Sequence, residues 1–372
     1  MSLFELSILP MALGIVLLLG QATFFRQTKL ALAIILLSSA VSFFCLPDNL
    51  FGQLVALSTV VNALLSMLNP PEPVEEYGVL LLSSSLGALV LCQASDWIYL
   101  FVGIELLTLP VYGLIAFEHR NAQNLKAAVK YFVLAGLSSA VMLLGMGVLY
   151  AQSGLLDLSL NNPLGGALFL MGVAFKLSVA PFYLWTPDVY EDSPLLVTAF
   201  LATVSKISFA SILASLSLSL NLLPILMLMA ILSMLVGAFL TLKTDQITRF
   251  LAYSSVAHMG YVLVAWITDG SVLFYMTSYV ISVLSIFAMI LWLDGEDLVG
   301  LWGKKPLPAL FLIFGFFSLM GLPITPIFWA KYRVLTAALV GDYTILFGTM
   351  ILSSLIAVYG YARFITRICQ RN

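Results

Sequence analysis

The chain has 372 residues, of which 62% are hydrophobic and 9% charged, and its formal net charge is −2. A mean hydropathy of +1.08 excludes an ordinary water-soluble domain and indicates that lipid surrounds most of the chain. The near-neutral charge, without runs of lysine or arginine, argues against nucleic acid as a partner. The three cysteines are scattered, so their spacing predicts no disulfide framework, iron–sulfur cluster or metal site.

Thirteen apolar stretches, each long enough to span a bilayer, follow one another along the chain. The first contains an apolar run from Ile8 to Gly20 that is long enough for a signal peptide but lacks a preceding positive charge and a convincing cleavage site, so we expect a membrane helix there. The sequence therefore predicts an all-α integral membrane protein of about 13 transmembrane helices. Their centres lie near Met11, Leu36, Leu57, Ser85, Leu107, Leu137, Phe175, Ser208, Ala230, Met259, Ser282, Met320 and Ser354.

Prolines interrupt two of the predicted helices, the seventh and the twelfth. Pro181 lies inside the seventh, and Pro323 and Pro326 lie inside the twelfth, which we expect to resume at Lys331. Within a bilayer, a broken helix is tolerated where its freed backbone groups face protein or a wet cavity. The two breaks therefore predict an internal polar path.

The positive charges predict the orientation of the chain. Of the 16 lysines and arginines, five lie inside predicted spans: Lys130, Lys176, Lys206, Lys331 and Arg333. The other eleven (16 − 5) all fall on one side of the membrane: Arg26, Lys29, Arg120, Lys126, Lys243, Arg249, Lys304, Lys305, Arg363, Arg367 and Arg371. By the positive-inside rule, the N-terminus lies outside and the C-terminus lies in the cytoplasm.

Charged positions and helix breaks also repeat along the chain. Lys176 follows Glu105 by 71 residues (176 − 105), Lys331 follows His258 by 73 (331 − 258), and each lysine lies in a broken helix. This spacing predicts two five-helix repeats, helices 4–8 and 9–13, which must be inverted relative to each other because five is odd. We expect an N-terminal three-helix segment at residues 1–76, a first repeat at 77–220 and a second at 221–372, all within one membrane domain.

Ionisable residues inside the spans are candidates for moving charge, because a charge at the centre of a membrane helix costs about 2.5–3.5 kcal/mol. Glu105 is the one acid among 18 that is predicted deep inside a span. Lys176 can pair with it, as a structural ion pair or as a proton switch. For Lys206 the predicted spans hold no second acid, so burial favours proton exchange over a lysine that snorkels to the interface.

Three other positions leave alternatives open. Lys130 lies near the start of the sixth helix, where a snorkelling or positioning role competes with membership of a relay. Of the two neighbouring basic residues Lys331 and Arg333, we expect Lys331 to be the buried one. His258 is either a satisfied interior histidine or part of a water chain with the neighbouring hydroxyls of Ser254, Ser255 and Tyr261.

An acidic cluster follows the seventh helix. Asp188, Glu191 and Asp192 are expected in the turn after the break, on the cytoplasmic side. They form either a solvated loop or a site of proton entry or subunit contact.

Five segments carry a family resemblance: GIELLTLPVYGLIAF, AAVKYFVLAGLSSAVMLLG, FKLSVAPFYLWTPDVYEDSPLLVTAFLATVSK, FLAYSSVAHMGYVL and GLPITPIFWAKYRVL. They resemble the antiporter-type membrane subunits of proton-pumping NADH:quinone oxidoreductase, respiratory complex I, and most closely the subunit N type. Within the third segment, APFYLWTPDVYE is the most specific part, because the other antiporter-type subunits read differently at this turn. The resemblance covers helices four to thirteen, about Gly78 to Arg363.

The resemblance implies that a glutamate, four lysines and a histidine form a hydrated proton axis along the membrane, here Glu105, Lys130, Lys176, Lys206, His258 and Lys331. It implies that this chain holds no cofactor and that NADH, FMN, the iron–sulfur clusters and quinone belong to partner subunits. The expected partners are other membrane subunits of complex I, including homologous antiporter-like subunits and small membrane subunits. The expected location is the inner (cytoplasmic) membrane.

Three features depart from the family pattern. Tyr183 stands where a histidine is usual, and Asp192 and Ser193 follow Glu191 where the family has a glycine and a small residue. A fourteenth helix is expected to be absent, because the sequence ends 41 residues (372 − 331) after Lys331. The absence of this helix would bear on contacts at that end and not on the proton axis.

Two other functions compete with proton pumping in a redox complex. A stand-alone sodium–proton or potassium–proton antiporter would favour an unpaired interior acid to coordinate the cation, and Glu105 is the one interior candidate. A purely structural membrane subunit would not require five basic residues inside the spans.

Overall fold

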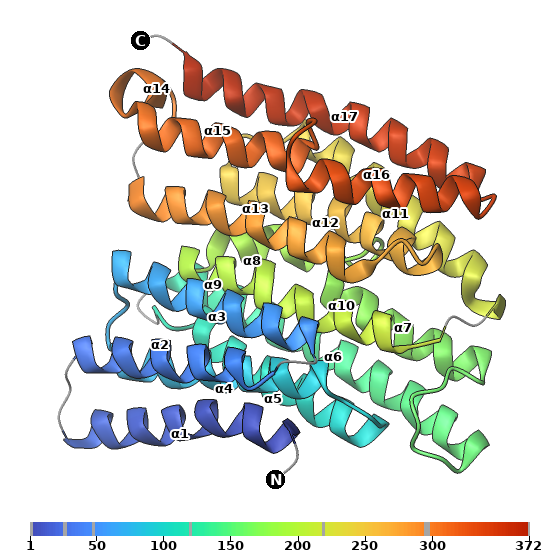
Figure 1. Ribbon diagram of the computed structural model, residues 1–372, viewed down its shortest axis with the longest axis horizontal. Coiled ribbons are helices and arrows are strands. Elements are labelled where there is room, and N and C mark those ends of the chain that lie inside the picture. Colours follow the sequence, from blue (N-terminus) through green and yellow to red (C-terminus); the bar gives the residue numbers. More distant parts are fainter. Residues whose placement is uncertain are drawn as a thin grey trace. The chain divides into compact units, whose positions relative to one another are not determined.

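The computed structural model describes residues 3–24, 28–46, 49–118, 121–217, 220–293 and 298–370 (Figure 1). Within these ranges the regular structure is helical, and the exception is an isolated β-bridge between Asp96 and Asp157. The prediction of an all-α membrane fold is confirmed.

Nine helical segments of the described ranges are long and apolar enough to cross a membrane, by length and composition. They are α3 (Leu50–Leu68), α4 (Val74–Cys92), α5 (Trp97–Ile115), α6 (Ala122–Ser153), Leu195–Ser215, α11 (Leu223–Thr241), α12 (Ile247–Ile267), α13 (Val272–Leu293) and α17 (Thr344–Cys369). Shorter apolar helical stretches lie at four further predicted spans: Ile8–Ala22 within α1 (Leu3–Phe24), α2 (Thr28–Phe44), α7 (Pro163–Leu177) and α15 (Pro306–Met320). The number of thirteen crossings stays a prediction.

Two compact units divide the chain. The first comprises Met1–Lys176 and Asp192–Ser217, and the second comprises Leu177–Glu191 and Leu218–Asn372. The division after residue 217 lies close to the predicted boundary between residues 220 and 221, whereas the second half of the seventh span groups with the second unit. The three predicted segments and the inversion of the repeats stay predictions.

Both predicted helix breaks are confirmed (Figure 1). The helix α7 ends one residue after Lys176, and α8 (Trp185–Asp192) begins after a non-helical stretch at 178–184. The helix α15 ends at Met320, the next residue, Gly321, has a left-handed φ of +85°, and α16 (Pro326–Val340) follows. The expectation that the twelfth helix resumes only at Lys331 is wrong, because Pro326 begins α16 at a position where its missing N–H sacrifices no hydrogen bond.

The eighth predicted span contains a π-turn that the sequence did not indicate. Three helical pieces, α9 (Leu195–Phe200), η1 (Leu201–Ser205) and α10 (Lys206–Ser215), follow one another without a gap, and η1 is the π-helical piece. Such turns are rare and frequently lie at functional sites. Here the π-turn ends directly before Lys206.

In the first unit, α4 packs tightly against α5. A Cβ atom on Gly87 would lie 2.2 Å from the backbone nitrogen of Leu107, so only glycine permits this approach. The hydroxyl of Ser84 donates to the carbonyl of Leu107 at 2.8 Å. These contacts hold the part of α5 that carries Glu105.

In the second unit, α17 runs alongside α15 and α16 and also packs on α11 (Figure 1). Arg363 of α17 donates to the carbonyls of Thr241, Leu242 and Thr244 at the end of α11. Carbonyls at a helix C-terminus have no partner within the helix, so this arginine satisfies them.

Candidate functional site

Lys176 is buried near the end of α7, where the seventh span breaks, and its side chain is 2% exposed. Its Nζ donates to Oγ1 of Thr108 on α5 at 3.4 Å. Thr108 donates its own hydroxyl proton to the carbonyl of Ile104, so its oxygen is left to accept from the lysine.

Two aromatic rings complete the surroundings of Lys176. The ring centroids of Tyr131 on α6 and Phe209 on α10 lie 6.0 and 5.9 Å from Nζ. Ring faces attract cations at such distances. The direct contacts of Lys176 are therefore with neutral groups.

Glu105 lies on α5, one helical turn before Thr108. The ion pairs within 4.0 Å among the described residues do not include Glu105, although its carboxylate acts electrostatically on Lys176. Its Oε1 atom is buried and finds no hydrogen-bond partner within the part of the chain that the structure describes. The direct pair that the sequence suggested is thus not formed in this structure, and Lys176 bonds to Thr108 instead.

Lys206 is 1% exposed at the start of α10. This burial argues against a lysine that snorkels to the interface. In the π-turn before it, Oγ1 of Thr203 accepts from Nδ2 of Asn62 on α3 at 3.4 Å. Lys130 is half-buried on α6, so both of its predicted roles stay open.

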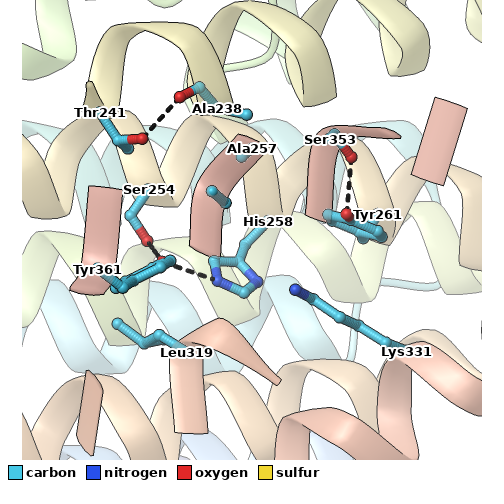
Figure 2. Close-up of a pocket in the computed structure, with 11 residues that line it drawn as sticks. Ala238, Thr241, Ser254, Ala257, His258, Tyr261, Leu319, Lys331, Ser353 and Tyr361 are labelled. Atoms are coloured by element: carbon cyan, nitrogen blue, oxygen red, sulfur yellow. Dashed lines mark hydrogen bonds between the residues drawn. The ribbon is translucent and has the colours of Figure 1, made fainter. Parts of the chain in front are cut away.

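His258 on α12 lies in a cluster of hydroxyl groups in the second unit (Figure 2). Its Nδ1 is 2.8 Å from the hydroxyl of Tyr275 on α13, and its Nε2 is 3.5 Å from that of Tyr361 on α17. The Tyr361 hydroxyl is also hydrogen-bonded to Ser254. Ser254 was expected near His258, whereas the two tyrosines were missed because they lie on other helices.

Lys331 on α16 is 7% exposed, and Arg333 is exposed, as the sequence predicted. The Lys331 Nζ donates to the carbonyl of Met320 at 3.2 Å. That carbonyl ends α15 at the break, where helix carbonyls lack internal partners. The ring centroid of Tyr261 lies 5.0 Å from the same Nζ.

A cavity of about 10 Å³ is lined by both His258 and Lys331. Figure 2 shows the amine of Lys331 reaching toward His258, with Tyr261 and Tyr361 on either side. A cavity of this size is at the lower limit of about 10–15 Å³ that holds one water molecule, and several lining groups are polar. The site can therefore hold a proton on either of two basic side chains and offers polar groups between them.

The acids after the seventh span lie in a helix and not in a turn. Asp188 and Glu191 belong to α8 and form ion pairs with Arg249 of α12, with Nε of Arg249 2.9 Å from Oε2 of Glu191. The two acidic side chains are 34% and 26% exposed, so the alternative of a freely solvated loop is wrong for this pair. Asp192 ends α8.

Across the described residues, no group of three or more histidine, cysteine or acidic side chains could hold a metal ion.

Residues 94–357 match the family model for the transmembrane part of NADH:quinone oxidoreductase and Mrp antiporters. The match contains Glu105, Lys331 and every candidate between them. The chain belongs to this family. Family members share the antiporter-like membrane fold, which agrees with the helices and breaks described above.

Among curated relatives, NADH-quinone oxidoreductase subunit N of Ectopseudomonas mendocina (strain ymp) is 38% identical over 332 residues, covering 80% of this chain and 67% of the relative. The resemblance to subunit N is confirmed. The chain spans about two thirds of the length of the curated relatives that it matches.

Two solved structures share the fold. A chain of respiratory complex I from Thermus thermophilus with bound aureothin has a TM-score of 0.90 and 28% identity, covering 98% of this chain and 90% of that chain. The Mrp complex from Dietzia sp. DQ12-45-1b gives a TM-score of 0.84 at 19% identity, covering 100% of this chain and 81% of that chain. The second likeness concerns the fold alone.

Proposed function

We propose that this chain translocates protons as an antiporter-like membrane subunit of proton-pumping NADH:quinone oxidoreductase. The observation that carries the proposal is the burial of four basic side chains in an apolar, membrane-type helical chain. Lys176, Lys206, His258 and Lys331 are 2%, 1%, 2% and 7% exposed. Such groups are expensive in a membrane and mark ion or proton paths.

Each unit has its own polar cluster that can hold a proton. In the first unit, the Nζ of Lys176 faces the Thr108 hydroxyl and lies within electrostatic range of Glu105. A shift of α5 that moves the carboxylate would change how strongly the lysine retains its proton.

In the second unit, Nε2 of His258 is positioned to exchange a proton with the Tyr361 hydroxyl, which continues to Ser254. Hydroxyl groups donate and accept at once, so such a chain can pass a proton along. The cavity beside His258 would let a single water connect it to Lys331. Lys130 and Lys206 complete the proposed path.

The redox chemistry belongs to partner subunits in this proposal. NADH, FMN, the iron–sulfur clusters and quinone would be bound there, and homologous antiporter-like subunits and small membrane subunits would contact this chain. The curated relatives are named as subunits of an NADH-quinone oxidoreductase, which supports this assignment. The N-terminus would lie outside the inner membrane and the C-terminus in the cytoplasm.

The test compares Lys331→Met with Arg333→Met in the assembled complex. The two residues lie on the same helix, but only Lys331 is buried beside His258. We expect Lys331→Met to reduce proton uptake by sealed vesicles several-fold and Arg333→Met to leave it nearly unchanged. Full proton uptake in Lys331→Met would contradict the proposal, and sodium transport in place of proton transport would favour the antiporter alternative.

A further inference from the structure

One of the residues that contact each broken-helix lysine occupies the same relative position in both units. Thr108 follows Glu105 by three residues (108 − 105), and Tyr261 follows His258 by three (261 − 258). Residues three apart share a helix face. Thr108 bonds to the Nζ of Lys176, and the ring of Tyr261 lies against the Nζ of Lys331.

We propose that Thr108 and Tyr261 are positioning residues that hold the ammonium groups of Lys176 and Lys331 in place. The inference rests on the proposed function, because a fixed position of the two ammonium groups matters only if these lysines carry the transferred proton. It adds two residues to the six that the family resemblance singled out.

The ring of Tyr261 is fixed from two directions. Its hydroxyl is hydrogen-bonded to Ser353 and Ser354 of α17, both at 2.7 Å, and donates to the carbonyl of Met350 at 2.9 Å. Its face is stacked on Tyr275, with centroids 6.0 Å apart and planes at 12°. A ring held in this way presents a constant face to the lysine.

The backbone at the helix break contacts Lys331 from another side. The Lys331 Nζ donates to the Met320 carbonyl at 3.2 Å, while the Tyr261 ring centroid lies 5.0 Å away. A Cβ on Gly321 would come within 3.1 Å of the Lys331 Cδ, so a glycine leaves room for the side chain. A carbonyl and a ring face both stabilise an ammonium group and offer much less to a neutral amine.

Lys176 is held by a hydroxyl group, that of Thr108, in place of a ring. Thr108 is fully buried, and its hydroxyl proton is engaged by the Ile104 carbonyl, which aims the oxygen at the lysine. Thr108 and Tyr261 therefore have the same effect through different chemistry. Each is a neutral group that holds a lysine in one place.

The test at Tyr261 uses Tyr261→Phe, Tyr261→Leu and a series of ring-fluorinated phenylalanines at position 261, all in the assembled complex. Fluorine withdraws electron density from the ring face and weakens its attraction for a cation while nearly keeping its shape. We expect Phe to retain most of the proton uptake per assembled complex, Leu to lose it several-fold, and uptake to fall stepwise with each added fluorine. A matched control is Tyr77→Leu, because Tyr77 is 2% exposed on α4 and lies outside both clusters.

The test at Thr108 compares Thr108→Val, which keeps the shape, with Thr108→Ser, which keeps the hydroxyl. We expect Val to lower proton uptake several-fold and Ser to retain most of it.

Equal uptake across the fluorinated series, or in Val and Ser, would overturn the inference for that residue. If Tyr261→Leu does not assemble, the fluorinated series still decides, because those variants keep a ring. If Lys331→Met loses proton uptake but uptake is the same across the fluorinated series, the positioning role of Tyr261 is refuted and the proposed function stands. Full proton uptake in Lys331→Met would refute the proposed function itself.

Discussion

Two buried lysines, Lys176 and Lys331, are held by neutral groups in the contacts that the described residues show. Lys176 bonds to a threonine hydroxyl, and Lys331 bonds to a backbone carbonyl. A neutral acceptor does not add the charge–charge attraction that a carboxylate partner in direct contact would supply. A carboxylate at a greater distance, such as Glu105, can then act as a control on the charge.

Replacing Glu105 with glutamine tests this control. Because Glu105 forms no ion pair within 4.0 Å among the described residues, we expect Glu105→Gln to leave the amount of assembled complex on native gels nearly unchanged. Proton uptake should fall strongly, since the charge that acts on Lys176 is gone. Glu105→Asp, which keeps the charge, should retain part of the uptake.

A structural ion pair gives the opposite pattern. Glu105→Gln would then lose assembled complex, and adding Lys176→Met would restore both assembly and proton uptake. Recovery of uptake in the double variant would rule out the switch.

The candidate residues could be predicted from the sequence more readily than their partners. A lysine or histidine inside an apolar run, such as Lys206 or His258, is visible because the surrounding residues define the membrane span. Tyr275 and Tyr361 lie 17 and 103 residues from His258, so nothing in the local sequence shows that they meet. Thr108 was the exception that could have been found, because it lies one turn after Glu105.

At the scale of helices, proline and glycine determine where the elements break and how closely they approach. Pro181 and Pro323 marked both breaks in the sequence, because proline cannot continue a helix. The π-turn at Leu201–Ser205 has no such marker and was missed. The helical state of α8 was also missed, because its acidic residues are typical of a turn and its ion pairs with Arg249 depend on a distant helix.

The contact between α4 and α5 makes Gly87 a sensitive position. We expect Gly87→Ala to push α5 away from α4, because the new Cβ would lie 2.2 Å from the Leu107 backbone nitrogen. Overpacking of this kind typically destabilises a protein by about 1–3 kcal/mol. The shift should also displace Glu105 and Thr108, so proton uptake per assembled complex should fall.

The matched control is Gly136→Ala on α6, where an added Cβ would meet no atom within 4 Å. Thermal stability in detergent and proton uptake should both stay near the unsubstituted values. An equal loss in the two variants would mean that the close approach of α4 and α5 does not matter.

At the scale of the whole molecule, the all-helical fold and the family could be predicted from the sequence, because hydropathy and charged motifs are local signals. The division into units could be predicted only in part. Residues 177–191 group with the second unit, where the backbone nitrogen of Ala180 donates to Ser233 on α11 at 2.8 Å. Such a contact across 53 residues leaves no trace in composition or periodicity.

The orientation in the membrane is testable by cysteine labelling. In a background without Cys45, Cys92 and Cys369, cysteines placed at Lys126 and Asp157 would flank the membrane-crossing part of α6. Both positions are exposed. We expect a membrane-impermeant reagent to modify them from opposite sides of sealed vesicles, with residue 126 cytoplasmic, and labelling from the same side would contradict the predicted topology.

The most direct test of proton transfer through this chain is the number of protons taken up per quinone reduced by sealed vesicles that carry Lys206 variants of the assembled complex. Lys206 is 1% exposed beside the π-turn, where a group that exchanges protons cannot be replaced by bulk solvent. We expect a strongly reduced ratio for Lys206→Ala and nearly the same reduction for Lys206→Arg, because arginine keeps its charge but does not release its proton. An unchanged ratio in Lys206→Arg would show that Lys206 supplies only a fixed charge, and an unchanged ratio in both variants would contradict proton transfer through this residue.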